Sequence, residues 1–449
     1  MKVEKFKEYI KGKKVSVIGI GISNRPLIKY LVSLGAVVTA YDKKTKEMLG
    51  DIAQELESMG VVLSLGDNYL DNLSGDVIFK TPGMRYDNPN LLKARENGSI
   101  ITSEMEVFFE ICPAGIIAIT GSDGKTTTTT LIHTMLKEAG YTAHLGGNIG
   151  TPLMTKAEEM KTTDYAVLEL SSFQLHTMKK SPHIAVITNI TPNHLDWHTD
   201  YQEYIDAKKN IARSLNKNDI LVTNKNNEEA RKIGESLKCE CRFFSSVDDA
   251  TVYLKDEVIY YKDEPVLKTK DIKIPGHHNV ENYMAAIAAV YDIVGKDVVQ
   301  KVAREFGGVP HRIELVRTIN GVRYYNSSID SSPNRTINTL NVFSEPVVLI
   351  AGGKDKGIPY DEIGQPIKEH VKTLILIGAT SKLIDDAVKS VNGNITTFYV
   401  NTYEEAVKLA KDNAVSGDVV LLSSASTSFD MFNNFEERGN LFKELVQKL

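Results

Sequence analysis

Cysteine and tryptophan are rare in this chain, and long apolar runs are missing. Of 449 residues only 3 are cysteines and 1 is a tryptophan. Cys112, Cys239 and Cys241 are too few and too scattered for a disulfide framework, and no second cysteine pair completes a zinc site. No segment approaches the roughly 18 uninterrupted apolar residues of a membrane helix. We therefore expect free thiols and no membrane span.

An excess of basic charge is also absent. The chain carries 53 Lys and Arg against 58 Asp and Glu, a net charge of −5, and it has no long basic run. A nucleic-acid partner is therefore not expected. The first residues, MKVEKFKEYIKGKK, are charged throughout and lack the apolar core of a secretory signal. With 42% hydrophobic and 25% charged residues, the composition predicts a soluble, cytoplasmic protein.

Short apolar runs alternate with helix-length amphipathic stretches along almost the whole chain. This alternation predicts an α/β fold with parallel sheets covered on both faces. In such sheets ligands bind beyond the carboxyl ends of the strands. The predicted strands are KVSVIGI, AVVTAYD, DVIFKTPG, GIIAITG, YAVLELSS, IAVITNI, DILVTN, PVVLIAGG, TLILIG and DVVLLSS.

The length exceeds what one hydrophobic core supports, so we predict several domains. Three α/β units are expected, over residues 1–103, 104–308 and 309–449. The segment SEMEVFFEICPAG begins the second unit, and GGVPHR marks the passage to the third. Residues 241–276 alternate short strands with turns and are predicted to form an antiparallel appendage to the second unit.

The first unit begins with strand, turn, helix and strand in VSVIGIGISNRPLIKYLVSLGAVVTAYD. Gly19 and Gly21 supply two glycines of a dinucleotide fingerprint, but Asn24 stands at the third place, which counts against NAD. Asp42 ends the next strand, where a ribose-binding acid would lie. The turn therefore either binds a nucleotide or sugar-nucleotide diphosphate or is only a tight strand-to-helix connection. The residues Thr81–Gly83, which end a later strand, are expected beside the same ligand.

The stretch AITGSDGKTTTTTL is a phosphate loop of unusual length. The common pattern G-x-x-x-x-G-K-[ST] fails, because its first glycine would fall on Ile119. The strand, glycine turn and helix start are nevertheless present, and backbone N–H groups at such a turn favour phosphate oxygens. Lys125 would reach the β and γ phosphates of a nucleoside triphosphate, and the Thr126 hydroxyl would bind Mg²⁺. We expect the Asp123 side chain to turn away from the phosphates and to cap the following helix.

Two further strand ends carry candidate metal ligands. Glu169 ends the apolar strand YAVLELSS, and a carboxylate on a buried strand is costly unless it is paired or metal-bound. His194 and Asp196 follow the next strand in NITPNHLDWH. A lone histidine is more often structural, but this one is expected at the same sheet edge as Glu169. The pattern favours a Mg²⁺ site.

The helix YQEYIDAKKNIARSL places a lysine on its apolar stripe. Lys208 lies four residues after Tyr204 and three before Ile211. An inward lysine needs a partner or a changed charge. The alternative is a lysine at the margin of the stripe whose ammonium extends to water, and the sequence leaves both open.

A further helix opens in PGHHNVENYMAAIAAVYDIVG. Asn279 is a candidate helix cap. Asn282, one turn later, is a candidate for recognising the edge of an adenine ring.

Taken together, these residues resemble the Mur ligase family over essentially the whole chain. The family's shorter loop, T-G-x-x-G-K-[ST], explains the missing glycine. Two stretches, LELSSFQL and SFDMFNNFEERGN, point to the branch of the family that adds D-glutamate. The resemblance is carried by GSDGKTT, GGNIGTP, NITPNHLD, GHHNVEN, PHRIE, AGGKDKG, LELSSFQL and SFDMFNNFEERGN.

The resemblance implies a Rossmann-like first domain that binds the UDP part of UDP-N-acetylmuramoyl-L-alanine. It further implies a P-loop-like central domain for ATP and a Rossmann-like third domain that closes over both and admits D-glutamate. The implied reaction belongs to peptidoglycan precursor synthesis. The γ-phosphate activates the substrate carboxylate as an acyl phosphate, and the D-glutamate amine attacks through a tetrahedral intermediate. A monomer with two Mg²⁺ ions is implied.

Matching positions imply roles for individual residues. Lys125, Glu169, His194 and Lys208 are the implied catalytic residues. Lys208 matches a lysine that the family carbamylates with CO₂, and with Thr126, Glu169 and His194 it would hold the metals. The implied ATP contacts are Gly121, Ser122, Asp123, Gly124, Lys125, Thr126, Thr127, Asn282, Arg312 and Asp330. The implied UDP-substrate contacts are Ile22, Ser23, Asp42, Thr81, Pro82, Gly83 and Asn148, and the implied D-glutamate contacts are Ser331, Lys356, Ser428, Phe429 and Phe435.

Some positions depart from the family pattern. Ser327 stands where an aspartate commonly contacts the ATP ribose, and we hypothesise that Asp330 takes over that contact. Asn193 replaces an acid, and Trp197 replaces a common basic residue. Three alternatives therefore stay open: a ligase for another amino acid, an NAD-linked oxidoreductase built on the first unit, and an inactive relative that only binds nucleotides.

Overall fold

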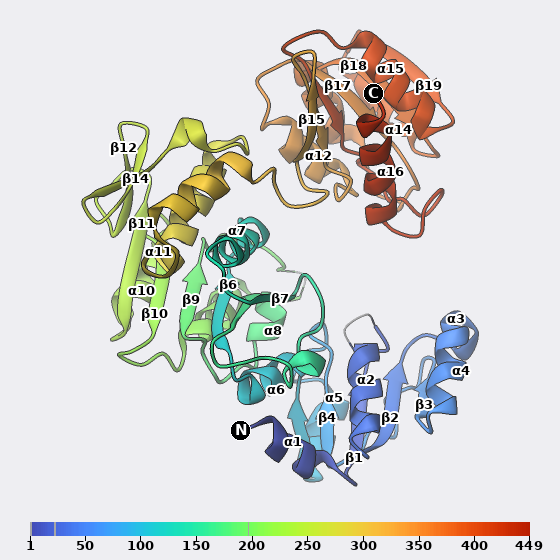
Figure 1. Cartoon of the computed structure of the whole chain (residues 1–449). Coiled ribbons are helices and arrows are strands. Elements are labelled where there is room, and N and C mark those ends of the chain that lie inside the picture. The colour runs from blue at the N-terminus through green and yellow to red at the C-terminus, as the bar shows by residue number, and fades with distance from the viewer. Residues whose placement is uncertain (1, 22–23, 196) are drawn as a thin grey trace. The chain divides into compact units, whose positions relative to one another are not determined.

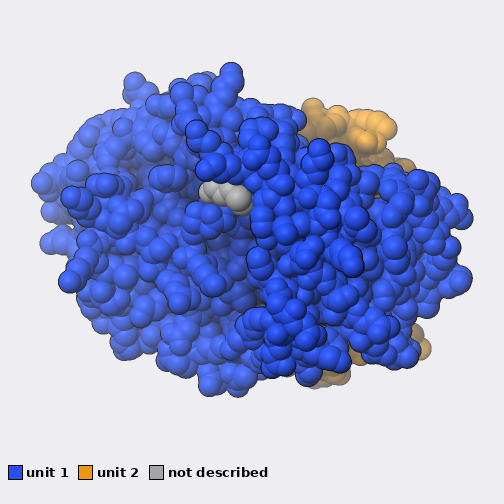
Figure 2. Space-filling view, turned by 90° about the horizontal axis from the view of Figure 1, so that it is seen from below, with its two compact units in different colours: residues 1–271, 278–303 blue, residues 272–277, 304–449 orange. Residues whose placement is uncertain are grey.

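The protein is described by a computed structural model that covers residues 2–21, 24–195 and 197–449. The chain forms two compact units. Unit 1 comprises residues 1–271 and 278–303, and unit 2 comprises residues 272–277 and 304–449 (Figures 1 and 2). Each of the three domain ranges predicted from the sequence contains one sheet, and the predicted boundaries themselves stay a prediction.

The first sheet of unit 1 is wholly parallel and has the order β3-β2-β1-β4-β5. Strand β1 has neighbours on both sides that follow it in the chain, so the chain reverses its direction of winding at this strand. Such a switch point opens a crevice at the carboxyl ends of the strands. The strands are β1 (Lys14–Ile18), β2 (Val37–Asp42), β3 (Val62–Leu65), β4 (Val77–Phe79) and β5 (Ile100–Thr102); the helices are α1 (Val3–Ile10), α2 (Asn24–Ser33), α3 (Lys46–Leu49), α4 (Asp51–Ser58) and α5 (Pro89–Glu96).

The second sheet of unit 1 has nine strands in the order β14-β13-β12-β11-β10-β9-β6-β8-β7. It has its own switch point at β6, which pairs in parallel with β9 on one side and β8 on the other. The strands are β6 (Gly115–Thr120), β7 (Ala143–Gly147), β8 (Tyr165–Glu169), β9 (Ile184–Ile187), β10 (Ile220–Asn224), β11 (Glu240–Ser245), β12 (Val252–Lys255), β13 (Val258–Tyr261) and β14 (Glu264–Lys268).

The predicted antiparallel appendage is only partly right. Strand β11 pairs in parallel with β10, and β12 pairs in parallel with β11. Only the β12–β13 and β13–β14 pairs of this segment are antiparallel, and β13 and β14 continue the central sheet at its edge (Figure 1). The alternation of short strands and turns suggested an antiparallel arrangement, whereas β11 and β12 join the sheet in parallel.

Helices on this sheet begin at residues with clear capping chemistry. The Ser103 hydroxyl accepts from Glu106 N at the start of α6, and the Asp200 carboxylate accepts from Glu203 N at the start of α9. The helices are α6 (Glu104–Ile111), α7 (Lys125–Glu138), α8 (Ser172–Leu175), α9 (Tyr201–Lys209), α10 (Glu228–Ser236) and α11 (His277–Glu305, interrupted at Gly295), with short 3₁₀ turns η1 (Met154–Lys156), η2 (Asn210–Ala212) and η3 (Thr269–Asp271).

The two sheets of unit 1 share one continuous hydrophobic cluster. Leu27 and Leu31 of α2 belong to the same buried cluster as Phe108 of α6 and Met154 of η1. Each such side chain contributes roughly 1.5–3 kcal/mol when it leaves water. The shared cluster fixes the carboxyl ends of the first sheet relative to those of the second.

Unit 2 holds a six-stranded sheet of order β15-β16-β20-β17-β18-β19, in which only the β15–β16 pair is antiparallel. Apolar residues of β17 and β20 are completely buried on both faces, as the continuous hydrophobic runs predicted. Unit 2 contains β15 (Glu314–Ile319), β16 (Val322–Asn326), β17 (Val347–Ala351), β18 (Val371–Ile377), β19 (Thr396–Val400), β20 (Val419–Leu422), α12 (Pro333–Leu340), η4 (Asp361–Ile363), α13 (Gly364–His370), α14 (Ser381–Ser390), α15 (Tyr403–Asn413) and α16 (Phe435–Gln447).

All ten strands predicted from the sequence are present, at or close to their expected positions. Among the described residues, no helix combines the length and apolar character that a membrane crossing requires.

Candidate active site

The phosphate loop lies at the switch point of the central sheet. It follows β6, whose neighbour β8 ends at Glu169 and whose other neighbour β9 leads into Thr188 and Asn189. Because parallel strands end at one edge, these residues gather around the start of α7. The binding roles predicted for these residues stay a prediction.

Two glycines shape the loop. Gly121 has φ of 152° and Gly124 has φ of 78°, both in the region that favours glycine. The Lys125 Nζ folds back over the loop and donates to the carbonyl oxygens of Gly121 (2.9 Å) and Ser122 (2.8 Å). The expected order of strand, glycine turn and helix start is therefore present, with the lysine ammonium above the turn.

The expected cap by Asp123 is wrong. Helix α7 begins after Gly124, and no side chain caps it. Asp123 is instead fixed through its main chain: its N–H donates to Asn189 Oδ1 (2.9 Å), and its carbonyl accepts from Thr188 Oγ1 (2.5 Å). Its side chain is exposed.

Glu169 forms a compact oxygen-rich cluster with two predicted site residues. Its carboxylate is buried and accepts from Thr126 Oγ1 (2.7 Å) and from Asn148 Nδ2 (2.8 Å). Asn148 therefore contacts the acid, a role that the sequence did not suggest. Carboxylate, hydroxyl and amide oxygens are the ligands that Mg²⁺ prefers, so the residues present fit this ion.

Lys208 points inward. Its side chain is only 2% exposed, its Nζ donates to the Gly121 carbonyl (2.7 Å), and it lies 4.6 Å from the centre of the Tyr204 ring. The structure thus decides between the two interpretations of the helical stripe. Burial, and secondarily the positive charge of Lys125, hold the pKa of Lys208 well below its usual value.

His194 lies on the exposed segment between β9 and α9. Its backbone adopts a left-handed conformation with φ of 54°, and its ring lies 5.0 Å from that of Phe173. Phe173 belongs to α8, which begins shortly after Glu169. Asp196, the other polar residue expected here, lies outside the described residues.

Asn282 lies beneath the loop. Its Oδ1 accepts from Thr128 Oγ1 (3.3 Å), and its Nδ2 donates to Asn279 Oδ1 (3.0 Å). A Cβ atom at Gly124 would collide with this amide. Asn279 lies inside α11, so the alternative that it caps the helix is wrong.

The predicted UDP side of unit 1 is also assembled from strand ends. The Asp42 carboxylate accepts from the N–H groups of Ile20 (2.6 Å) and Lys44 (2.9 Å), which holds the glycine turn after β1. Asn24, found where a third glycine was missing, donates to the Ile18 and Gly19 carbonyls and so closes the same turn.

Thr81, which follows β4, lies beside the turn after β1, and a Cβ added at Gly19 would approach Thr81 at 3.4 Å. Pro82 is half-buried, and Gly83 is exposed. Ile22 and Ser23 lie outside the described residues. Asp42 and Thr81 therefore lie at the carboxyl ends of neighbouring strands of the first sheet, whereas Asn148 lies against Glu169, and UDP binding by these residues stays a prediction.

The predicted D-glutamate residues all belong to unit 2. The Lys356 Nζ and the Ser331 Oγ approach to 3.5 Å, and the loop containing Ser428 is joined to the Lys354 segment by a bridge between Lys354 and Thr427. Phe429 is exposed, and Phe435 begins α16. Arg312 precedes β15 of the same unit. The meeting of these residues with the phosphate loop stays a prediction.

Asp330 is buried in unit 2. It is 5% exposed, and its Oδ2 accepts from the hydroxyls of Thr339 and Ser423, both at 2.8 Å. Burial raises the pKa of this carboxyl, while those hydroxyls and Ser327 oppose the rise. This environment favours a structural role over the predicted ribose contact, which stays untested.

Sequence reasoning did not identify Tyr204 as the residue of α9 that contacts the phosphate loop. The Ser122 hydroxyl lies 2.9 Å from the Tyr204 hydroxyl and also 2.9 Å from both the N and O atoms of Thr191. The only available signal was that Tyr204 and Lys208 share one helical face. Through this contact the helix that carries Lys208 is tied directly to the phosphate loop.

Comparison with known proteins agrees with this geometry. Residues 119–290 match the Mur ligase middle domain, and residues 311–426 match the domain described as "Mur ligase, glutamate ligase domain". A relative from Ruminiclostridium cellulolyticum is 53% identical, with 100% of this chain and 99% of the relative covered. The chain belongs to the Mur ligase family. That relative, one from Acetivibrio thermocellus (55% identity, 100% and 99% covered) and one from Clostridium botulinum strain 657 (52%, 99% and 99%) are each named UDP-N-acetylmuramoylalanine--D-glutamate ligase.

Solved structures of other Mur ligases share the fold. The MurC UDP-N-acetylmuramate-alanine ligase of Thermotoga maritima matches with a TM-score of 0.58 at 21% identity, covering 97% of this chain and 99% of that one. MurF of Acinetobacter baumannii matches with a TM-score of 0.57 at 15% identity, covering 98% and 92%. At these identities the likeness establishes the three-domain α/β fold alone. Family membership removes the oxidoreductase alternative.

Proposed function

We propose that this Mur ligase uses ATP to join D-glutamate to UDP-N-acetylmuramoyl-L-alanine, releasing ADP and phosphate. The observation that carries the proposal is the gathering of Lys125, the Thr126–Glu169 pair and Lys208 around one phosphate loop. The choice of D-glutamate rests on the full-length relatives of more than 50% identity that bear that name. The proposed substrates are nucleotides and an amino acid of the cytoplasm, so we place the enzyme in the cytoplasm. We further propose that it acts as a monomer.

The residues of the loop serve phosphoryl transfer by position and charge. The backbone N–H groups at the start of α7 and the Lys125 ammonium neutralise the phosphate oxygens of ATP. Thr126 and Glu169 would hold Mg²⁺, and this ion would supply positive charge to offset the negative charge of the phosphoryl group. Asn148 keeps the Glu169 carboxylate oriented. The UDP-substrate carboxylate, placed beside the γ-phosphate, attacks it to form an acyl phosphate.

Lys208 supports the same site as a carbamate. Burial lowers the pKa of Lys208 and so favours the neutral amine, the form that attacks CO₂. The step forms an N–C bond, converts CO₂ to a carboxylate and releases one proton. Lys125, whose charge disfavours a cation at Lys208, favours this anion. The product is a carboxylate suited to a second Mg²⁺ with His194.

Unit 2 would supply the second half of the reaction. Lys356, beside Ser331, is placed to pair with a carboxylate of D-glutamate, and Ser428 adds a hydrogen-bonding group. The D-glutamate amine then attacks the acyl phosphate, and the tetrahedral intermediate collapses to the amide and phosphate.

Phosphate release tests the function. The purified protein is given ATP, Mg²⁺ and UDP-N-acetylmuramoyl-L-alanine, and each of D-glutamate, L-glutamate, L-alanine, L-lysine and diaminopimelate is supplied in turn. Release with D-glutamate alone supports the proposal. Release with another amino acid identifies a ligase of different specificity, and no release with any of them indicates an inactive relative.

A further inference from the structure

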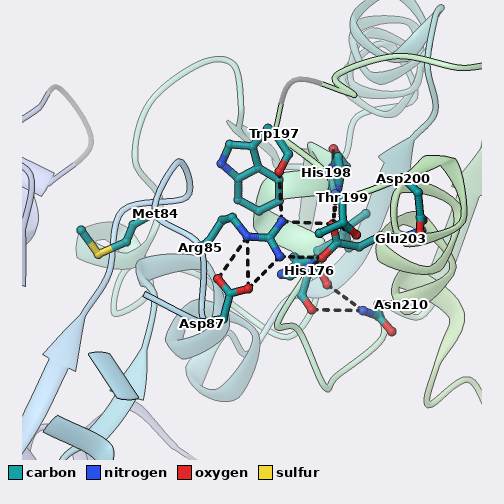
Figure 3. A network of polar contacts seen from close by, with 12 residues as sticks. Met84, Arg85, Asp87, His176, Trp197, His198, Thr199, Asp200, Glu203 and Asn210 are labelled. Atoms are coloured by element: carbon teal, nitrogen blue, oxygen red, sulfur yellow. Dashed lines mark hydrogen bonds and ion pairs between the residues drawn. The ribbon is translucent and has the colours of Figure 1, made fainter. Parts of the chain in front are cut away.

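An ion pair joins the end of the first sheet to the helix that carries Lys208. Arg85 lies on the segment after β4, and Glu203 lies in the first turn of α9 (Figure 3). The guanidinium binds the carboxylate through two hydrogen bonds, Nη2 to Oε1 at 2.9 Å and Nη1 to Oε2 at 3.1 Å. Both side chains are mostly buried, at 24% and 19% exposure, so water screens this pair less than a surface pair.

Glu203 is held in place by its own part of the chain. Its Oε2 accepts from the Thr199 N–H (2.6 Å) and hydroxyl (3.1 Å), and its Oε1 accepts from His176 Nε2 (3.0 Å). The Arg85 guanidinium is the main reason that the pKa of Glu203 lies far below its usual value. The carboxylate is therefore a fixed, charged anchor on α9.

Arg85 is similarly fixed on its own side. It pairs with Asp87 on the same segment (2.9 Å), donates to the Trp197 carbonyl (3.0 Å), and its guanidinium carbon lies 5.1 Å from the centre of the Trp197 ring. Figure 3 shows the arginine between these groups and Glu203. A planar guanidinium that bonds at both edges and lies against an aromatic ring sets orientation as well as distance.

A second contact crosses the same junction. The Trp197 indole Nε1 donates to the Gly83 carbonyl (2.9 Å), and the Trp197 N–H donates to the His194 carbonyl (3.1 Å). Gly83 belongs to the proposed UDP loop, whereas His194 belongs to the proposed metal site. The network therefore runs from one proposed ligand site to the other.

The histidines beside Glu203 raise a different possibility. His176, His198 and Glu203 offer three potential metal-ligand atoms within 4.8 Å of one another. Both carboxylate oxygens, however, already accept from Arg85, and a metal cation would have to displace that positive charge. Burial lowers the pKa of His198 to about 4, so this ring is neutral and does not compete with Arg85. The contacts favour a structural connection over a metal site.

We propose that Arg85 and Glu203 are positioning residues that hold the UDP loop at a fixed distance from the carboxylate-activating site. The inference rests on the proposed function, because one substrate molecule must reach both places. Lys208 follows Glu203 by five residues on α9, which is about 7.5 Å along a helix. A rigid Arg85–Glu203 contact therefore sets where the carboxylate of a loop-bound substrate falls relative to Lys208.

The test compares binding of UDP alone with binding of the whole UDP-N-acetylmuramoyl-L-alanine, by calorimetry, in Arg85→Gln, Glu203→Gln and the double variant. UDP contacts only the loop, so its affinity should stay within about twofold of wild type. The whole substrate spans the junction and should bind about tenfold more weakly in each single variant. Because the two residues act through one contact, the double variant should be no weaker than either single variant.

Asp87→Asn is the matched control, because it removes the other carboxylate partner of Arg85 and leaves the contact with Glu203 in place. It should bind both ligands like wild type. Steady-state kinetics should show a raised KM for the UDP substrate and an unchanged KM for ATP in the Arg85 and Glu203 variants. Unchanged affinity for the whole substrate, an equal loss for UDP alone, or additive effects in the double variant would each overturn the inference. An inactive wild type would instead refute the proposed function, while the UDP binding comparison would still report on the loop.

Discussion

At the scale of single residues, Lys208 has the environment that is hardest to explain without chemistry. A lysine 2% exposed beside a second lysine is costly to keep charged, and a methionine of similar size would pack without that cost. The hydrogen bond to the Gly121 carbonyl satisfies only one of its N–H groups. The proposed carbamate would explain why an amine stands at this position.

The carbamate predicts dependence on bicarbonate. Wild-type enzyme prepared in CO₂-free buffer should lose most of its activity and regain it when bicarbonate is added. The kcat of Lys208→Ala should fall by a factor of about 10²–10³. This factor is typical of enzymes that lose one group stabilising charge in the transition state. The measurement is phosphate release, with intact-protein mass spectrometry for the CO₂ adduct.

Lys209→Ala serves as the control, since this neighbouring lysine is exposed and should keep full, bicarbonate-dependent activity. Wild-type activity that ignores bicarbonate, together with an active Lys208→Ala variant, would rule out the carbamate.

Residue placement was predictable where a local pattern carried the information. The helical stripe around Lys208 placed the lysine either inside the protein or at the margin of the stripe, and the strand end at Glu169 indicated a polar site. The Arg85–Glu203 pair joins positions 118 residues apart, and no local pattern links them. Asp330 likewise depends on Thr339 and Ser423, which come from other parts of the chain. Such partners follow only from the folded arrangement.

At the scale of elements, the turn from β6 into α7 decides how phosphate is bound. Gly124 takes a left-handed conformation, and Asn282 packs directly against it. An added methyl group would be strained by roughly 1–2 kcal/mol in this conformation and would also displace the Asn282 amide. The first N–H groups of α7 would then be displaced.

Gly124→Ala should therefore raise the KM for ATP at least tenfold while leaving UDP binding unchanged. Gly140→Ala is the matched control at the other end of α7, because Gly140 has a similar φ of 88° and nothing within 4 Å of an added Cβ. Gly140→Ala should have a similar backbone strain, but its KM for ATP should equal that of wild type. Equal ATP affinity in the two variants, measured by calorimetry, would show that the contact with Asn282 is unimportant.

The fold at this scale was largely predictable, since apolar runs gave the strands β6, β8 and β9 around the phosphate loop, but they missed β7, which leads to Asn148, and β16, which leads to Asp330. The edge of the central sheet was not predictable, because β12 pairs in parallel with β11 although only residues 246–251 separate the two strands. The direction of these strands is determined by their pairing with neighbouring strands and does not follow from the local turns.

At the scale of the whole molecule, the reaction requires three ligands to meet. Unit 1 holds the switch point at β1 and β4 and the phosphate loop at β6, and both sheets pack on one shared hydrophobic cluster. Unit 2 carries Lys356 and Ser331, the residues proposed for D-glutamate. The account therefore requires that the carboxylate bound by unit 1 is activated before the amine bound by unit 2 attacks it.

An oxygen-transfer experiment tests this order most directly. UDP-N-acetylmuramoyl-L-alanine labelled with ¹⁸O in both carboxylate oxygens is converted with ATP and D-glutamate, and the released phosphate is analysed by mass spectrometry. Activation by the γ-phosphate predicts that each phosphate carries one ¹⁸O from the substrate and that the other stays in the new amide. Released phosphate without ¹⁸O would contradict the account, because ATP would then have been hydrolysed without activating the carboxylate.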